Sequence, residues 1–277
     1  MSSSAGLGDD DLMSFSSATA LLRTPGGSLG WEVPDGWQQG RGAWGGLVAG
    51  GVVRAVEAHE PDPSRRLRTV SLHLPGPLGV GGATVRVDPL RIGSAMSTWS
   101  VTVESAGDLC AHAVVLTGST RVPAETTLGW GTSAAPPLPP WQDLPLLPTG
   151  LPGMPAFMQQ LELRPAEGLP LAGTQARCSG YVRFVDQGSW DAAQLVGIVD
   201  AWYPTALAAL AVQRPLATVT SANHLLLDPE TVPAGQPLVY EAAMAAANDG
   251  FTTETRRLWT LDGRLAVENH QSVVIIR

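Results

Sequence analysis

The stretch from Asp191 to Val212 constrains the fold of this chain more than any other part of it. It is the longest run of apolar, helix-compatible residues in the second half, and its apolar side chains leave no clear polar stripe. A helix of this kind is usually buried on most sides. We therefore predict a buried helix that Ser189 caps, that carries Asp191 in its first turn, and that breaks or restarts at Pro204.

One carboxylate, Asp200, stands in the middle of this apolar stretch. Removing an unpaired carboxylate from water is costly, so a buried acid has a partner, a raised pKa or a catalytic role. The alternative is that Asp200 caps the helix that restarts at Pro204, or is simply exposed near the break. The helix by itself does not decide between these interpretations.

The composition bounds the size and class of the protein. A chain of 277 residues, with 44% hydrophobic and 15% charged residues, can bury a sizeable core in one large or two ordinary domains. All 17 basic residues are Arg, which excludes Schiff-base chemistry and a P-loop lysine. The formal net charge of −8 argues against general nucleic-acid binding, which requires a basic surface.

Cysteine usage and the apolar runs indicate where the protein acts. Cys110 and Cys178 are far apart and lack CxxC spacing, so we expect neither a disulfide framework nor a metal site, and we expect a cytoplasmic location. Residues 1–11 are expected to form a disordered tail without the features of a signal peptide. No apolar run reaches the roughly 18 residues that a membrane span needs, so we expect no membrane partner.

The order of predicted elements indicates an α+β fold. In the first half a weak strand, one helix and consecutive strands are predicted at Met13–Arg23, Leu47–His59, Leu67–Leu74, Ala83–Leu90, Ser97–Glu104 and Ala111–Thr117. A Pro-rich segment from Pro123 to Pro155 fits no regular element. After it, strands are predicted on both sides of the apolar helix, at Phe157–Leu163, Gln175–Val185, Ala217–Leu227, Leu238–Ala246, Thr253–Leu261 and Leu265–Ile276. Helices packed on mostly antiparallel strands are typical of this class.

Similar spacings indicate that the two halves are repeats. Leu109–Arg121 and Leu265–Arg277 both begin with Leu after a Gly-containing turn and end with Arg. Aligning these segments places Val115 against Gln271.

A second pair of short words extends the repeat. The sequence segments that begin at Thr69 and Thr218 are similar, and aligning them places Gly51 against Asp200. We therefore predict a polar site in the second half and a degenerate site in the first half.

Longer motifs resemble a known family. They are GAWGGLVAGGVVRAVEA in the first half and LVGIVDAWYP, LATVTSANHL and LDGRLAVENHQSVVIIR in the second. With them the chain, from about Met13 to Arg277, is similar to the bacterial acyl-CoA thioesterase II group of the thioesterase-like superfamily. The resemblance implies a double hotdog: two tandem domains, each a curved antiparallel sheet around a central helix, with the sheets joined edge to edge. We expect the domains at residues 13–121 and 154–277, with a Pro-rich linker at residues 122–153.

The resemblance also implies a site. The family's Asp after the second-half helix, Thr on the next strand and Gln on the last strand correspond to Asp200, Thr218 and Gln271. The family often has an acid and a histidine directly after the Thr, and here Thr220 and Ser221 stand in that region, so the alignment of Thr218 can slip to Thr220. In the first half, the helix offers no carboxylate where some single-hotdog thioesterases carry one.

The implied activity is hydrolysis of acyl-CoA thioesters to a free acid and CoA, by an activated water and without a covalent intermediate. We expect a hydrolase of lipid metabolism that needs no cofactor and assembles as a homo-oligomer, a dimer or tetramer of double hotdogs. The alternative is a non-catalytic protein that binds acyl-CoA or lipid. A hydratase on the same fold would need a paired Asp and His, which no segment supplies, and the GxGxxG match at residues 40–45 lacks a preceding apolar strand.

Overall fold

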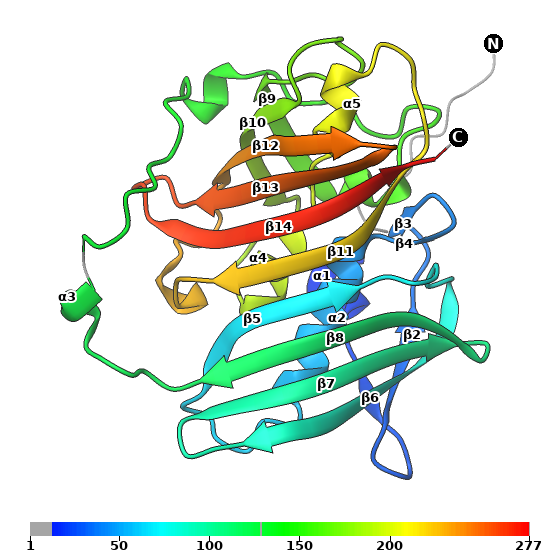
Figure 1. Ribbon diagram of the computed structural model, residues 1–277, viewed down its shortest axis with the longest axis vertical. Helices are drawn as coiled ribbons and strands as arrows, with labels where there is room; N and C mark the ends of the chain where they lie inside the picture. Colours follow the sequence, from blue (N-terminus) through cyan, green and yellow to red (C-terminus); the bar gives the residue numbers. More distant parts are fainter. Residues whose placement is uncertain (1–12, 128, 277) are drawn as a thin grey trace.

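One antiparallel sheet runs through the whole molecule (Figure 1). The computed structural model describes residues 13–127 and 129–276, so the tail predicted at residues 1–11 lies outside the described residues. The sheet has 12 strands in the order β1-β2-β6-β7-β8-β5-β11-β14-β13-β12-β10-β9. The first half of the chain therefore forms one end of the sheet and the second half forms the other.

The first half contributes a long helix and its share of the sheet. Its helices are α1 (Phe15–Ala18) and α2 (Gly45–Glu57). Its strands are β1 (Leu22–Arg23), β2 (Leu29–Val33), β5 (Arg66–His73), β6 (Gly81–Ile92), β7 (Met96–Ser105) and β8 (Asp108–Gly118), and a separate small ribbon pairs β3 (Gln38–Gln39) with β4 (Gly42–Ala43).

The second half repeats this plan with a shorter central helix. Its helices are α4 (Ala192–Ile198) and α5 (Ala206–Ala209), with short 3-10 turns η2 (Ala156–Gln160) and η3 (Pro229–Thr231). Its strands are β9 (Leu161–Glu167), β10 (Arg177–Phe184), β11 (Leu216–Leu225), β12 (Leu238–Asn248), β13 (Phe251–Trp259) and β14 (Leu265–Ile275).

Two predicted strands are partly wrong. Within Met13–Arg23, residues Phe15–Ala18 are helical, because the Ser14 hydroxyl caps the turn by accepting the Ser17 N–H, and only Leu22–Arg23 is a strand. Within Phe157–Leu163, the first residues belong to the 3-10 turn η2, and β9 begins at Leu161. Both segments lie at the beginning of one half of the chain, and each is too short for its residue pattern to distinguish a strand from a helical turn.

The two halves are joined edge to edge, as the double-hotdog prediction requires. Strands β5 and β11 pair antiparallel, with His73 opposite Thr220 and Thr69 opposite His224. Helices α2 and α4 lie behind the sheet and pack against each other (Figure 1). The fold is therefore a double hotdog.

The buried helix of the second half begins differently from the prediction. Its N-cap is Asp191, whose carboxylate accepts the Gln194 N–H at 2.8 Å while the Gln194 side chain accepts the Asp191 N–H at 3.0 Å. Ser189 therefore does not cap this helix, because this reciprocal capping box satisfies the helix start two residues later. Every residue of α4 is buried, as the missing polar stripe predicted.

The Pro-rich segment packs against the second half. It contains the short helix α3 (Ala124–Thr127) and the 3-10 turn η1 (Trp141–Asp143), and its described residues contribute no strand to the sheet. The Tyr181 hydroxyl donates to the Pro139 carbonyl at 2.8 Å, and the guanidiniums of Arg164 and Arg183 lie 5.0 and 5.1 Å from the Trp141 ring centre. We keep the domain limits at 13–121 and 154–277 as a proposal on this basis.

Irregularities of the sheet show how the halves correspond. The pairing of β5 with β8 shifts between Leu67 and Thr69, and the pairing of β11 with β14 shifts between Thr218 and Thr220. Superposing these two bulges places Leu67 on Thr218 and Thr69 on Thr220. The alignment of Thr69 with Thr218 is therefore wrong by two residues. A bulge changes the face of the sheet on which a side chain lies, and the similarity of two short sequence segments does not reveal where a bulge occurs.

The alignment of the last strands is right. Val115 lies opposite Val70, three residues after the bulge position Leu67, and Gln271 lies opposite Ser221, three residues after Thr218. Val115 and Gln271 therefore occupy equivalent places in the two halves.

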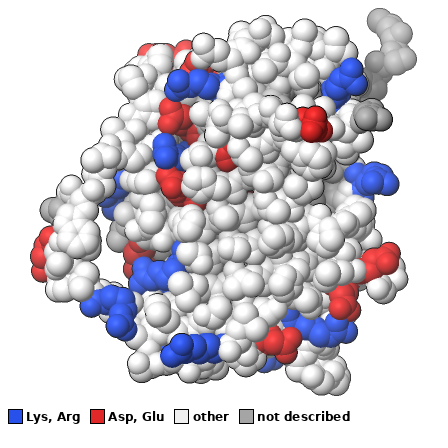
Figure 2. Space-filling model, in the orientation of Figure 1, with Lys and Arg blue, Asp and Glu red and all other residues white. Residues whose placement is uncertain are grey.

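The outer face of the sheet carries few charges at its centre. Figure 2 shows that Arg, Asp and Glu side chains lie mainly along the margins of this face. The centre is formed by small or neutral side chains of β5, β11 and β14, such as Ser71, Ala222 and Ser272. The charged groups described next lie on the opposite, buried face.

Candidate active site

The structure brings the three predicted site residues together. The Gln271 amide Nε2 donates to Asp200 Oδ1 at 2.7 Å, and the Thr218 hydroxyl donates to Gln271 Oε1 at 3.2 Å. Asp200 lies just after α4, Thr218 in β11 and Gln271 in β14. A carboxylate, a carboxamide and a hydroxyl thus form one hydrogen-bonded chain.

Local structure explains why these side chains meet. Asp200 follows the helix C-cap Val199, and its N–H donates to the Gly197 carbonyl at 3.0 Å, so the last turn fixes its backbone. Gln271 faces inward because it alternates with the outward, exposed His270. The bulge at Thr218 turns that hydroxyl toward Gln271.

The first half of the chain holds the other side of Asp200. The Trp44 indole N–H donates to the Asp200 carbonyl at 2.9 Å, and the backbone N–H of Gly46 lowers the pKa of the Asp200 carboxyl. A Cβ built on Gly45 would lie 2.8 Å from Asp200 Oδ2. The carboxylate therefore sits at the N-terminus of α2, where the helix dipole favours negative charge.

Two charged residues that the sequence analysis missed complete the site. Arg256 donates to Asp200 Oδ1 at 3.0 Å and pairs with Glu254 at 2.5 Å. Glu254 in turn accepts the N–H and the hydroxyl of Thr205, at 2.8 and 2.5 Å. The available signal was spacing: Glu254 and Arg256 are two apart in a strand and share one face with the apolar Leu258.

Burial and the neighbouring charges set the ionisation of the site. Burial raises the pKa of Asp200 above its ordinary value, although Arg256, Gln271 and the Gly46 N–H oppose that shift and Glu254 adds to it. Burial alone would disfavour the charged form of Arg256, but the surrounding acids, with Glu254 foremost, keep its pKa raised. The site is thus a carboxyl of raised pKa beside a permanently charged guanidinium, an arrangement common at catalytic sites.

Access to the site is limited. The Asp200 side chain is 12% exposed, Gln271 is buried, and Thr218 and Gly45 are half-buried. Asp200 and Thr218 are therefore the partly exposed members of this group, whereas Gln271 and Arg256 are buried.

The same positions of the first half are apolar. Leu67 and Val115 stand where the second half has Thr218 and Gln271, and both are buried. Counted from the first residue of each helix, the position of Asp200 corresponds to Val53 in α2, so the alignment of Asp200 with Gly51 is wrong by two residues. A polar site of this kind is therefore built in the second half, with α2 of the first half as one wall.

The described residues 13–127 and 129–276 contain no group of three or more His, Cys, Asp or Glu side chains placed to hold a metal ion. Cys110 and Cys178 are free and buried, and burial raises the pKa of the Cys178 thiol to about 12. Among the same residues, no helix is both long and apolar enough to cross a membrane.

Sequence comparison identifies both halves. A family model of the acyl-CoA thioesterase N-terminal domain matches residues 33–118, and a model of the acyl-CoA thioesterase C-terminal domain matches residues 132–275. A search of curated protein sequences finds no significant match.

Solved structures share the fold along nearly the whole chain. A hot dog protein of unknown function from Alicyclobacillus acidocaldarius is similar with a TM-score of 0.87 and 22% identity, over 95% of this chain and 98% of that one. A putative thioesterase II from Thermobifida fusca is similar with a TM-score of 0.80 and 21% identity, over 95% of this chain and 98% of that one. An acyl-CoA thioesterase II from Mycobacterium marinum is similar with a TM-score of 0.73 and 15% identity, over 95% of this chain and 97% of that one. With two consecutive domain models matched in order, the chain belongs to the acyl-CoA thioesterase II-like family.

Proposed function

We propose that the protein hydrolyses acyl-CoA thioesters to a free acid and CoA, with Asp200, Thr218 and Gln271 as its catalytic residues. The observation that carries this proposal is the asymmetric setting of the Asp200 carboxylate. Its Oδ1 accepts from Gln271 and Arg256, while its Oδ2 faces the N-terminus of α2 beside Gly45. One oxygen is thus fixed by the protein, and the other is directed toward the half-buried side of the site.

In this mechanism Asp200 Oδ2 takes a proton from water as the water attacks the thioester carbonyl. General-base assistance of this type contributes roughly 10²–10⁴ in rate. The raised pKa of Asp200 suits the role, because a base works best when its pKa is near the working pH. The attack forms the C–O bond, the C–S bond then breaks, and the proton held on Asp200 Oδ2 passes to the departing sulfur, so that the free acid and the CoA thiol leave and the Asp200 carboxylate is restored.

Thr218 and Gln271 have different parts in the mechanism. Gln271 uses its amide N–H on Asp200 and its carbonyl on Thr218, so it orients the base. The Thr218 hydroxyl donates to Gln271 and still has oxygen lone pairs that can accept a hydrogen bond from the attacking water. The N-terminus of α2 provides positive potential for the charge that develops on the carbonyl oxygen.

A thiol-release assay across short, medium and long acyl-CoAs tests the proposal, with Asp200→Asn as the matched inactive variant. We expect release by the wild-type protein and a loss on the order of 10²-fold or more in the variant. Binding of every acyl-CoA without release of thiol would instead support the alternative, a non-catalytic acyl-CoA or lipid binder. We further propose a cytoplasmic enzyme of lipid metabolism that assembles as a homo-oligomer.

A further inference from the structure

The inner face of the second half carries two rows of polar residues across three neighbouring strands. In one row, Glu254, Gln271 and Ser221 lie opposite one another on β13, β14 and β11. In the next row, Arg256 and Asn269 lie opposite each other, followed by Asn223. All six residues are buried. Such rows are unusual on a face that packs against helices, because burying polar groups costs free energy unless they are paired.

The equivalent rows of the first half are entirely apolar. The bulge between Pro89 and Arg91 on β6, opposite Trp99 and Thr98, matches the bulge between Met244 and Ala246 on β12, opposite Glu254 and Thr253. This match places Trp99 on Glu254 and, two residues later, Val101 on Arg256. The two rows of the first half are Trp99, Val115 and Val70, then Val101, Ala113 and Leu72.

The first half therefore serves as an internal control. It builds the same sheet around the same kind of helix with apolar side chains at all six positions. The fold does not need a charged pair at Glu254 and Arg256, so the pair is there for another reason.

The contacts of the pair lead to the base of the proposed reaction. The Arg256 Nε and Nη2 atoms bond Glu254 Oε1, and Nη1 bonds both Asp200 Oδ1 at 3.0 Å and the Trp202 carbonyl at 3.2 Å. Arg256 and Glu254 are only 1% and 2% exposed, so neither meets substrate directly. Glu254 is itself fixed by the backbone N–H and hydroxyl of Thr205.

We propose that Arg256 and Glu254 are positioning residues that hold the Asp200 carboxylate in place and set its charge for the reaction. Arg256 binds Oδ1 and so leaves Oδ2 for the attacking water. Glu254 holds the guanidinium at a fixed angle, because a planar guanidinium bonded on several edges cannot rotate. The inference rests on the proposed function for its kinetic consequences, although the ionisation of Asp200 can be measured without turnover.

Arg256 and Glu254 carry opposite charges near Asp200, so removing them should shift the pH dependence of the reaction in opposite directions. A purely structural role would not produce such opposite shifts. Removing the positive charge with Arg256→Gln should shift the acid limb of kcat/KM to higher pH, by about 1–3 pH units for a charge within ~4–6 Å. Removing the negative charge with Glu254→Gln should shift it to lower pH, since Glu254 raises the pKa of Asp200. Arg256→Lys keeps the charge and should keep the limb near its wild-type position while lowering kcat.

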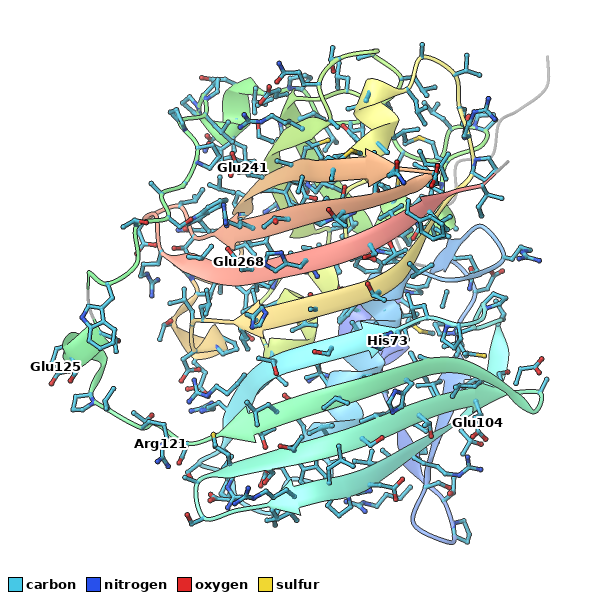
Figure 3. The ribbon with its side chains drawn as sticks, in the orientation of Figure 1. His73, Glu104, Arg121, Glu125, Glu241 and Glu268 are labelled. Carbon is cyan, nitrogen blue, oxygen red and sulfur yellow. The ribbon has the colours of Figure 1, made fainter. Side chains whose placement is uncertain are left out.

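Matched controls lie on the same strand pair, on the outer face. Arg257 pairs with Glu268 at 2.6 Å on β13 and β14, and Figure 3 shows Glu268 on β14. Arg257→Gln and Glu268→Gln remove the same charges from an outer-face ion pair and should leave the limb unchanged.

Arg256→Gln leaves the Asp200 and Glu254 carboxylates in the interior without the guanidinium that both contact, and this variant can fail to fold. The double variant Glu254→Gln/Arg256→Gln avoids this imbalance. It should bring the limb back toward the wild-type position while kcat stays low, because both charges and the fixed geometry are lost together.

A carbon-13 NMR titration of the Asp200 carboxyl, assigned by its loss in Asp200→Asn, gives the same shifts without an activity assay. If wild-type protein releases no thiol, yet Glu254→Gln lowers and Arg256→Gln raises the pKa of the Asp200 carboxyl while Arg257→Gln and Glu268→Gln leave it unchanged, the proposed reaction is wrong and the positioning inference stands. If the enzyme is active and Asp200→Asn is inactive, but neither charge change moves the limb or the titration, the positioning inference is wrong.

Discussion

The Oδ2 atom of Asp200 lies against Gly45, so close that a Cβ on this glycine would be 2.8 Å from it. Asp200 follows α4 of the second half, and Gly45 is the first residue of α2 in the first half. The candidate site is therefore shared between the two halves of the chain, although its three predicted residues all come from the second.

Gly45→Ala should lower activity strongly and also lower stability. The added methyl group would lie 2.8 Å from Asp200 Oδ2, so the carboxylate has to move away from the Arg256 and Gln271 groups that hold it. A misplacement of about 1 Å in such a site can lower turnover on the order of 10²-fold. Thiol release and thermal unfolding measure the two effects, and Gly82→Ala, where a Cβ would meet nothing within 4 Å, is the control. Equal activity of both variants would show that Oδ2 is not the reacting oxygen.

Thr218→Val should lower kcat about tenfold, the effect expected for one hydrogen bond of roughly 1.4 kcal/mol in the transition state. The matched control is Thr69→Val, because Thr69 lies in the equivalent strand but alternates with the buried Val70 and so faces outward. Steady-state kinetics with one acyl-CoA compare the pair. A larger loss from Thr69→Val than from Thr218→Val would contradict the assignment of the site to the second half.

Gln271→Ala should change both the rate and its pH dependence. The amide donates to Asp200 Oδ1 at 2.7 Å and lowers the pKa of that carboxyl, so its removal should move the acid limb of kcat/KM to higher pH. A loss of rate with an unmoved limb would mean that Gln271 contacts the reactants and does not orient the base. Val115→Ala, at the equivalent position of the first half, tests for the effect of a truncated core side chain alone.

Asp200→Asn should become relatively more stable as the pH rises. Burial raises the pKa of Asp200 above its ordinary value, so the folded protein favours the neutral carboxyl. The stability that this carboxyl contributes is present below the unfolded-state pKa and is lost as the pH rises through the folded-state pKa. The difference in Tm between variant and wild type should therefore grow from about pH 4 upward and then level off. A difference that shrinks over this range would show that the pKa is lowered in the fold.

The sequence by itself determined the architecture and the identity of three polar residues. Strand alternation and the apolar stretch around Asp200 are local patterns, and they specify one helix and a run of strands in each half. The family motifs then located Asp200, Thr218 and Gln271, which the structure joins by hydrogen bonds of 2.7 and 3.2 Å.

Tertiary structure decided what surrounds Asp200. Gly45 and Trp44 are more than 150 positions away in the chain, and only the packing of α2 against α4 brings them to the carboxylate. Arg256 reaches it because β13 lies beside β14 in the sheet, a pairing that no local pattern encodes. The bulge at Thr218 is a further case: an inserted residue reverses the faces of a strand, and only the register of the paired strands shows where it lies.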